Sequence, residues 1–454
     1  MDRVVMLEFN ELTPRLLYPL MQAGELPNFQ KLFSSSEVYT TDAGESGYEL
    51  NPWVQWVTVH TGKTFAEHGV FLLGEGHERN DLDTIAAKVE RAGFKSWQCG
   101  SMNVPLTQNN GSYGLPDPWA PRETVAHPSP LNSYHQFVQS QVQEHTNPNA
   151  ANKLEELMSF ARFMWTHGLT ITSCFKTLEQ LTSETFAKNR TGRALLLDTF
   201  QFDVFQKVFK RIEPLFASFF SNSVAHMQHC YWRDYQPELF QSQNSYESAN
   251  ANAIRSAYKA NDELVGRALK FGDDVTIVFC TALSQEPAVN WEDSGGKRFY
   301  RPYDLEEFCN FAGLDQWVSI EPVMAEEFWI SFKDTEAAEL GENQVKQIFS
   351  GNQRAFKTSV IDNRLYTGCS IIDLLPDNAE IENRATGRSL PIGSLLYCSD
   401  TVKSGMHNPE GMFWVRRPNG KHLVHENPIP LTAVAPYLEG LLGVGNNRLA
   451  LSAG

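Results

Sequence analysis

A short apolar run that ends in polar residues is the feature that most restricts what this chain can fold into. Residues 215–220 have the length and aromatic content of a strand buried on both faces, and Asn222, His226 and His229 follow it. Ligands of open α/β sheets bind beyond the carboxyl ends of the strands, so these side chains are candidates for chemistry. A His-x-x-His pair suits a metal ion or an anionic substrate, although surface or capping histidines show the same spacing.

Further strands and helices alternate along the chain in the order that an α/β fold requires. Each expected strand is short and apolar, and each expected helix carries an apolar face. We therefore predict a central, mostly parallel sheet sandwiched by helices. The expected strands are residues 3–9, 94–99, 275–280 and 411–415, and the expected helices begin near residues 14, 51, 81, 249 and 431.

Two stretches interrupt this alternation. Residues 121–212 are rich in Phe, Leu and Gln with no obvious strand, and they predict a helical insertion that could serve as a lid. Residues 291–394 predict a small α+β subdomain, because their middle part reads as strand 326–332, helix 336–349 and strand 356–361. The α/β core is then expected to comprise residues 1–120, 213–290 and 395–454.

Composition restricts which binding partners and which cellular compartment we expect for this chain. A formal net charge of -16 over 454 residues argues against nucleic acid or an anionic membrane as the main partner, since both attract basic surfaces. Seven scattered cysteines without a Cys-x-x-Cys pair fit a reducing compartment. No leader precedes the first expected strand, and no apolar run approaches the length that spans a membrane. We therefore expect a soluble cytoplasmic protein; its oligomeric state stays open.

Several segments, collinear over most of the chain, resemble one known group of enzymes. They are VVMLEFNELTPRLL, AGELPNFQKL, WVTVHTGKTFAEHGV, TIAAKVERAGFKSWQCGS, GLPDPWA, the strand ending at Asn222, NDELVGRALKFGDDVTIVF, MHNPEGMFWV and IPLTAVAPYLEGLLG. In this order the chain resembles the alkaline phosphatase superfamily, in its type I phosphodiesterase and nucleotide pyrophosphatase branch. The resemblance implies an alkaline phosphatase-like fold, with gaps at the helical insertion and the subdomain.

The same resemblance implies a site that has lost most of its charge. The family holds two metal ions with Asp and His side chains, around a Thr or Ser nucleophile. Carried over position by position, these residues fall on Asn10, on Pro52 for the nucleophile, on Asn222 and His226, on Cys280, Thr281, Ala282 and Leu283, and on His407. One metal position therefore keeps Asn222, His226 and His407, and the other keeps no charged ligand. We expect one divalent metal, zinc or another, or none.

The candidate residues divide into two groups. We assign catalytic roles to His226, His229, Glu8 and Glu49, and substrate binding to Asn10, Gln55, His60 and Lys63. Glu11 brackets Asn10 from the other side, but the alternation of a strand places Glu8 on the same side as Asn10 and favours Glu8. Asn10 and Asn222 either replace ligands by hydrogen bonding or have decayed into Asx turns.

Three functions from different classes remain. The first is a repurposed enzyme that cleaves or transfers a group on a phosphorylated or sulfated small molecule, such as a glycan or nucleotide derivative. The second is a non-catalytic member that binds such an anionic ligand or a partner. The third is a glycosyl or acyl transfer in the same cleft, using Glu8 or Glu49.

Overall fold

A nine-stranded mixed sheet forms the centre of the protein in the computed structural model, which describes residues 2–143, 153–187, 191–241, 250–323, 326–399 and 402–445. The strand order is β20-β2-β19-β6-β1-β5-β3-β4, with β21 beside β2. The five strands from β6 to β4 run parallel, and β19 is antiparallel to both of its neighbours. The strands are β1 (Arg3–Phe9), β2 (Glu37–Asp42), β3 (Ser96–Cys99), β4 (Tyr113–Leu115), β5 (Phe216–Ser221), β6 (Val275–Cys280), β19 (Glu410–Arg416), β20 (Leu423–Val424) and β21 (Ile429–Pro430).

The three central strands bring distant parts of the chain to one edge. Side chains of β1, β5 and β6 are buried on both faces, as expected for parallel strands covered by helices on each side. Phe9 pairs with Ser221, and Glu8 pairs with Cys280. The residues that follow these strands, including Asn10 and Asn222, therefore lie side by side at the carboxyl edge.

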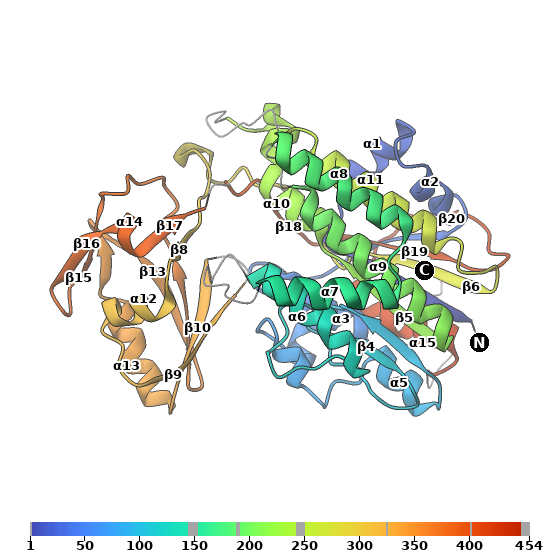
Figure 1. Cartoon of the computed structure of the whole chain (residues 1–454), viewed down its shortest axis with the longest axis horizontal. Helices are drawn as coiled ribbons and strands as arrows, with labels where there is room; N and C mark the ends of the chain where they lie inside the picture. Colours follow the sequence, from blue (N-terminus) through green and yellow to red (C-terminus); the bar gives the residue numbers. More distant parts are fainter. Residues whose placement is uncertain are drawn as a thin grey trace.

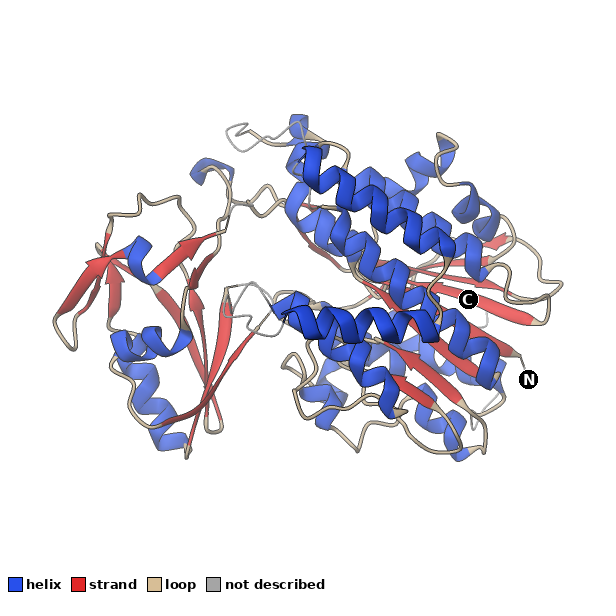
Figure 2. Cartoon of the chain, in the orientation of Figure 1, coloured by secondary structure: helices blue, strands red, loops and turns tan. Residues whose placement is uncertain are grey.

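Helices cover both faces of the sheet, so the α/β sandwich predicted from the sequence is confirmed (Figures 1 and 2). Prolines in the first turn begin α1, α2 and α3, where a missing N–H costs nothing. One face is covered by α1 (Pro14–Gln22), α2 (Pro27–Phe33), α9 (Gly192–Ile212), α10 (Ser223–Tyr235) and α11 (Ala253–Ala268). The other is covered by α3 (Pro52–Thr61), α5 (Ile85–Arg91) and α15 (Val434–Leu442).

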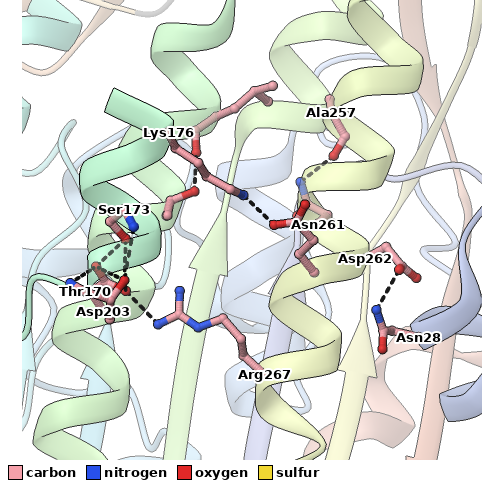
Figure 3. Close-up of polar contacts among 12 residues, drawn as sticks. Asn28, Thr170, Ser173, Lys176, Asp203, Ala257, Asn261, Asp262 and Arg267 are labelled. Carbon is pink, nitrogen blue, oxygen red and sulfur yellow. Dashed lines mark hydrogen bonds and ion pairs between the residues drawn. The ribbon is translucent and has the colours of Figure 1, made fainter. Parts of the chain in front are cut away.

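A helical segment is inserted between β4 and β5. It comprises α6 (Asn132–Gln143), α7 (Lys153–His167), α8 (Ile171–Ala187) and α9. The buried Asp203 of α9 accepts hydrogen bonds from Ser173 of α8 and from Arg267 of α11, at 2.5 and 2.6 Å (Figure 3). These contacts attach α8 and α9 to the core helix α11. Among the described helices, none combines the length and apolar composition needed to cross a bilayer.

A second unit with its own hydrophobic core spans residues 300–398 and lies beside the main sheet, on the left of Figure 1. It contains antiparallel sheets and two main helices. Its elements are β8 (Tyr300–Pro302), α12 (Leu305–Ala312), β9 (Trp317–Pro322), β10 (Glu327–Phe332), α13 (Thr335–Val345), β11 (Ile348–Ser350), β12 (Gln353–Arg354), β13 (Phe356–Ile361), β14 (Arg364–Cys369), β15 (Glu380–Asn383), β16 (Arg388–Pro391), α14 (Ile392–Leu395) and β17 (Leu396–Cys398). The helix expected over 336–349 ends early because β11 follows it.

Two strand pairings were not predicted from the sequence. Strand β2 mixes buried and partly exposed residues and joins the sheet beside β19. A short antiparallel ribbon pairs β7 (Ser284–Pro287) with β18 (Gly405–Asn408). Both ribbon strands are polar and lack the apolar run that marks the central strands. This ribbon carries His407 to the carboxyl edge of the sheet.

We predict that Arg267→Met lowers the free energy of unfolding by about 3–5 kcal/mol, because it leaves the buried Asp203 carboxylate without its cation. Lys176→Met is the matched control, since Lys176 pairs with Glu263, which is mostly exposed, and should cost under about 1 kcal/mol. Urea denaturation of both variants checks this. Equal losses would show that the Asp203–Arg267 contact does not anchor the insertion.

Candidate functional site

The first polar residue after β1 is held in one orientation by an indole. Trp56 Nε1 donates to Asn10 Oδ1 at 2.8 Å, and an indole nitrogen can only donate. The amide nitrogen of Asn10 must therefore face the other way, where it donates to Asn222 Oδ1 at 2.8 Å and to Glu11 Oε1 at 3.0 Å. The positions at which the resemblance places two Asp metal ligands are thus hydrogen-bonded to each other.

The remaining positions of the two-metal pattern are also occupied by structural contacts. Thr281 Oγ1 accepts a hydrogen bond from the backbone N–H of Met412 at 2.9 Å. Ala282 follows it in the left-handed region, with φ 56°. Pro52 begins α3 and offers no hydroxyl. Among the described residues, hydrogen bonds thus occupy the positions of Asn10, Asn222 and Thr281, and the nucleophile position carries no hydroxyl.

Glu11, the next residue after Asn10, is the centre of a different cluster. It adopts φ 55°, a conformation that a residue with a long side chain rarely takes and that marks many functional sites. Its carboxylate is almost fully buried. Oε2 lies 2.9 Å from His229 Nε2, 3.4 Å from His407 Nε2 and 2.5 Å from Gln285 Nε2. Three segments far apart in the sequence therefore meet on one oxygen atom.

The β7–β18 ribbon explains how two of these groups reach Glu11. His407 lies directly opposite Gln285 in the antiparallel register, and cross-strand partners project to the same face. His229 comes from α10 on the other side. The Gly405 carbonyl of the ribbon lies 3.0 Å from its Nδ1.

The hydrogen bonds of His229 restrict the charge of the cluster. The Gly405 carbonyl can only accept, so Nδ1 of His229 carries a proton and donates it. Nε2 then faces the Glu11 carboxylate at 2.9 Å. Two acceptors do not meet at this distance, so a proton or a metal cation must lie between Nε2 and Oε2.

The pKa values fit an ionised carboxylate beside a neutral imidazole. Burial alone would raise the pKa of Glu11, but His407, His229 and the donor Gln285 outweigh it and lower the pKa from 4.5 to about 2. Burial lowers the pKa of His407 from 6.5 to about 4, against the opposite effect of Glu11. At neutral pH, Glu11 is therefore charged and His407 has a free lone pair.

This donor set fits a divalent metal ion. The ligand atoms of Glu11, His229 and His407 all lie within 4.8 Å of one another. Ligands of a tetrahedral zinc stand roughly 3.4 Å apart at ordinary bond lengths, close to the 2.9 and 3.4 Å seen here. Gly405 and Gln285 orient two of the ligands in the way that outer partners of metal sites do. Two histidines and one carboxylate would leave a coordination position open for substrate.

The cluster lines a cleft of about 2770 Å³ between the core, the helical insertion and the subdomain. His226, one turn before His229, also lines the cleft and is exposed to solvent; its Nδ1 lies 3.9 Å from Cys230 Sγ. Lys403 lines it as well, and burial together with the charge of Lys297 lowers the pKa of Lys403. The predicted ligands Asn222 and His226 thus share the cleft with His407 but are not part of the Glu11 cluster.

Other predicted site residues lie elsewhere. Glu8 and His60 form a fully buried pair, 2.8 Å apart, beneath the sheet. Gln55 is buried and donates to the backbone carbonyl of Glu49 at 2.7 Å. Lys63 follows the far end of α3. Glu8, Glu49, Gln55, His60 and Lys63 are not among the described residues that line the cleft. Their predicted catalytic and substrate contacts therefore have no geometric support.

Glu11 and Lys403 line the cleft but are not among the candidate residues chosen from the sequence. Strand alternation favoured Glu8, but the chain leaves the strand after Phe9, so alternation no longer applies at Glu11. Pro14 at the first turn of α1 was the available signal, because it leaves residues 10–13 for a tight turn. No sequence pattern marks Lys403, which is notable only for its position four residues before His407.

The fold and the site define an α/β protein whose cleft centres on a buried carboxylate and two histidines. No model of a known protein family matches the chain. No curated protein matches it either. Solved structures similar to it include the following two.

An inactive variant of murine ectonucleotide pyrophosphatase / phosphodiesterase 5, in complex with AMP, is 10% identical with a TM-score of 0.46, covering 100% of this chain and 98% of that chain. The human ectonucleotide pyrophosphatase / phosphodiesterase 5 is 9% identical with a TM-score of 0.44, covering 98% and 96%. Both names belong to the branch that the sequence resembles. At this level of similarity, the likeness supports no statement about activity.

We predict that Asn10→Asp and Asn222→Asp have unequal effects. Asn10→Asp removes the donor to Asn222 and places a second carboxylate about 3 Å from Glu11, so the free energy of unfolding should fall by about 1–3 kcal/mol. Asn222→Asp keeps an acceptor for Asn10 and should cost less. Thermal unfolding at neutral pH compares the two, and the reverse order would mean that the amide of Asn10 is turned around.

We also predict a dependence of stability on pH that His407 causes. Its pKa is lower in the folded state, about 4, than the unfolded value of 6.5, so the unfolded chain binds more protons between these values. Stability contributed by neutral His407 is therefore present above pH 6.5 and lost as the pH falls towards 4. Between pH 7 and pH 5, wild type should lose on the order of 1 kcal/mol more than His407→Gln. Urea denaturation at both pH values tests this, and equal losses would contradict the burial of His407 beside Glu11.

Proposed function

We propose that the chain is an enzyme that cleaves or transfers a phosphoryl- or sulfuryl-linked group of an anionic small molecule, as a divergent member of the alkaline phosphatase superfamily. The observation that carries the proposal is the convergence of Glu11, His229 and His407 at the carboxyl end of β1, inside a large cleft. We expect the group bound at the cluster to belong to a phosphorylated or sulfated glycan or nucleotide derivative.

Electrostatics at the cluster explain how an anion could enter. An ionised Glu11 repels a phosphate or sulfate, unless a positive charge neutralises it first. A divalent cation that Glu11, His229 and His407 would hold supplies that charge. Lys403 adds positive charge to the same cleft, although the chain as a whole is acidic. Local charge thus favours an anionic substrate at this point.

A bound divalent cation would polarise the phosphorus or sulfur centre as a Lewis acid. The chain's own residues do the rest. Pro52 offers no nucleophile, so a water molecule or an acceptor hydroxyl attacks directly and forms the new oxygen bond. The proton of the attacking group passes to the exposed His226. The bond to the leaving oxygen breaks, and that oxygen departs with the electron pair.

One observation favours a second candidate, a member that binds an anionic ligand without turnover. The Asn10–Asn222 hydrogen bond and the proline at the nucleophile position remove groups on which the family's chemistry depends. A glycosyl or acyl transfer has no such support, because Glu8 and Glu49 are not among the described residues lining the cleft.

We predict that the purified protein hydrolyses bis(4-nitrophenyl) phosphate and binds at most one zinc or manganese ion per chain. His229→Ala and His407→Ala should lose the metal and at least about 100-fold in kcat/KM, since each removes a ligand. His226→Ala should keep the metal and lose about 100- to 10,000-fold, as expected for a general acid or base. Elemental analysis and nitrophenolate release measure the two quantities.

His422→Gln serves as a control, because His422 is exposed at the far edge of the sheet beside β20. It should leave metal content and turnover unchanged. Tight binding of an anionic ligand without turnover would support the second candidate. Unchanged turnover in His229→Ala and His407→Ala would refute the site itself.

A further inference from the structure

Helix α8 of the insertion has its polar and apolar faces reversed. In a surface helix of a globular protein, the apolar face normally packs on the core. Here the stripe Ile171, Phe175, Leu178 and Leu181, spaced i, i+4, i+7 and i+10, points to solvent, with side chains 55% to 77% exposed. The opposite face, which includes the buried Ser173, is polar and packs inward.

Polar contacts fix this orientation. Ser173 donates to Asp203, and Lys176 pairs with Glu263 of α11 at 2.5 Å (Figure 3). Thr170, just before α8, donates its backbone N–H to Asp203 at 3.1 Å. These bonds hold the polar face of α8 against α9 and α11. The apolar stripe therefore cannot turn inward without breaking them.

Helix α7 also exposes large apolar side chains. Leu157 and Met158 are at least half exposed, and Trp165 is 81% exposed. Soluble proteins rarely leave so many large apolar side chains together on the surface without a function. We call Leu157, Trp165, Leu178 and Leu181 the apolar wall, because these four exposed side chains line the cleft.

The apolar wall and the Glu11 cluster line one continuous cleft. His229, His407 and Lys403 lie in the polar part, and the apolar wall extends it along the insertion. At about 2770 Å³, the cleft is several times larger than most pockets for small molecules, which measure roughly 300–1,000 Å³. A compact anion would fill only the polar part.

We propose that the substrate is an amphiphile, with a phosphorylated or sulfated head at the Glu11 cluster and a long alkyl chain along the apolar wall. The proposal rests on the function proposed above for the head group, and the tail is the new element. The apolar wall gives the tail a place out of water, beside the reacting centre. A membrane surface fits less well, because the chain carries a net charge of -16 and helices that lie on membranes are typically rich in Lys and Arg.

A pair of esters with one head group tests the tail. Methyl 4-nitrophenyl phosphate and dodecyl 4-nitrophenyl phosphate, both below the micellar concentration, differ only in the chain. The wild type should have a kcat/KM at least about tenfold higher for the dodecyl ester, since covering even one leucine-sized group changes an equilibrium about tenfold. The double variant Leu178→Gln and Leu181→Gln should lose this preference and keep its activity on the methyl ester.

The matched control is Leu340→Gln, because Leu340 is equally exposed on α13 but is not among the described residues that line the cleft. It should leave both esters unchanged. Glutamine preserves helix propensity and charge, so the exposed substitutions should not disturb folding or the attraction of the anion.

Binding tests the tail even if neither ester is turned over. Dodecyl phosphate should shift the tryptophan emission of the wild type to shorter wavelength, and methyl phosphate should not. The shift should be smaller in Trp165→Phe and in the double variant. If neither ester is hydrolysed but dodecyl phosphate still shifts the emission, the proposed function is refuted and the binding of an amphiphile is supported.

The inference would be overturned if the wild type showed equal kcat/KM values for the methyl and dodecyl esters and equal emission shifts with methyl and dodecyl phosphate. Binding of the wild type to phosphatidylcholine vesicles, if the double variant abolishes it, would also overturn the inference. Self-association in the ultracentrifuge that the double variant abolishes would do the same. In either case the apolar wall would be a docking surface.

Discussion

A buried, ionised carboxylate at the end of the first strand is the constraint on which the rest of the site depends. A charge removed from water must be paired, and Glu11 is paired by groups from three other segments. These segments are brought within reach by the parallel register of β1, β5 and β6 and by the β7–β18 ribbon. The left-handed backbone of Glu11 turns its side chain out of the strand pattern and towards them.

The same edge of the sheet is closed by hydrogen bonds between uncharged groups. The donor-only indole of Trp56 fixes Asn10, and Asn10 in turn satisfies Asn222. Amide groups provide both a donor and an acceptor, so they close a network that two carboxylates could hold together only around cations. The insertion then widens the cleft with an apolar wall, attached to the core through Asp203 and Arg267.

The sequence predicts the α/β sandwich because β1, β5 and β6 are apolar runs, and such runs indicate strands buried on both faces. The sequence also proposes His229 and His407 as candidates because both follow recognisable segments, and the two residues line one cleft. Strand alternation favours Glu8 over Glu11, but alternation holds only inside a strand, and Glu11 rather than Glu8 lines the cleft. The β7–β18 ribbon cannot be predicted from the local sequence, because its polar strands lack a hydrophobic pattern. The Asn10–Trp56 contact cannot be predicted either, because the two residues lie 46 positions apart. The reversed faces of α8 become visible only once the tertiary contacts of Ser173 and Lys176 are known.

The central claim is that Glu11, His229 and His407 form one cation-dependent centre. A crystal structure of the protein soaked with zinc and a phosphate analogue, with anomalous scattering recorded at the zinc edge, tests it most directly. We predict one strong peak at about 2.0–2.2 Å from Glu11 Oε2, His229 Nε2 and His407 Nε2, with the anion between this peak and His226. A peak held by Asn222, His226 and His407 instead, or an anion bound outside the cleft, would contradict it.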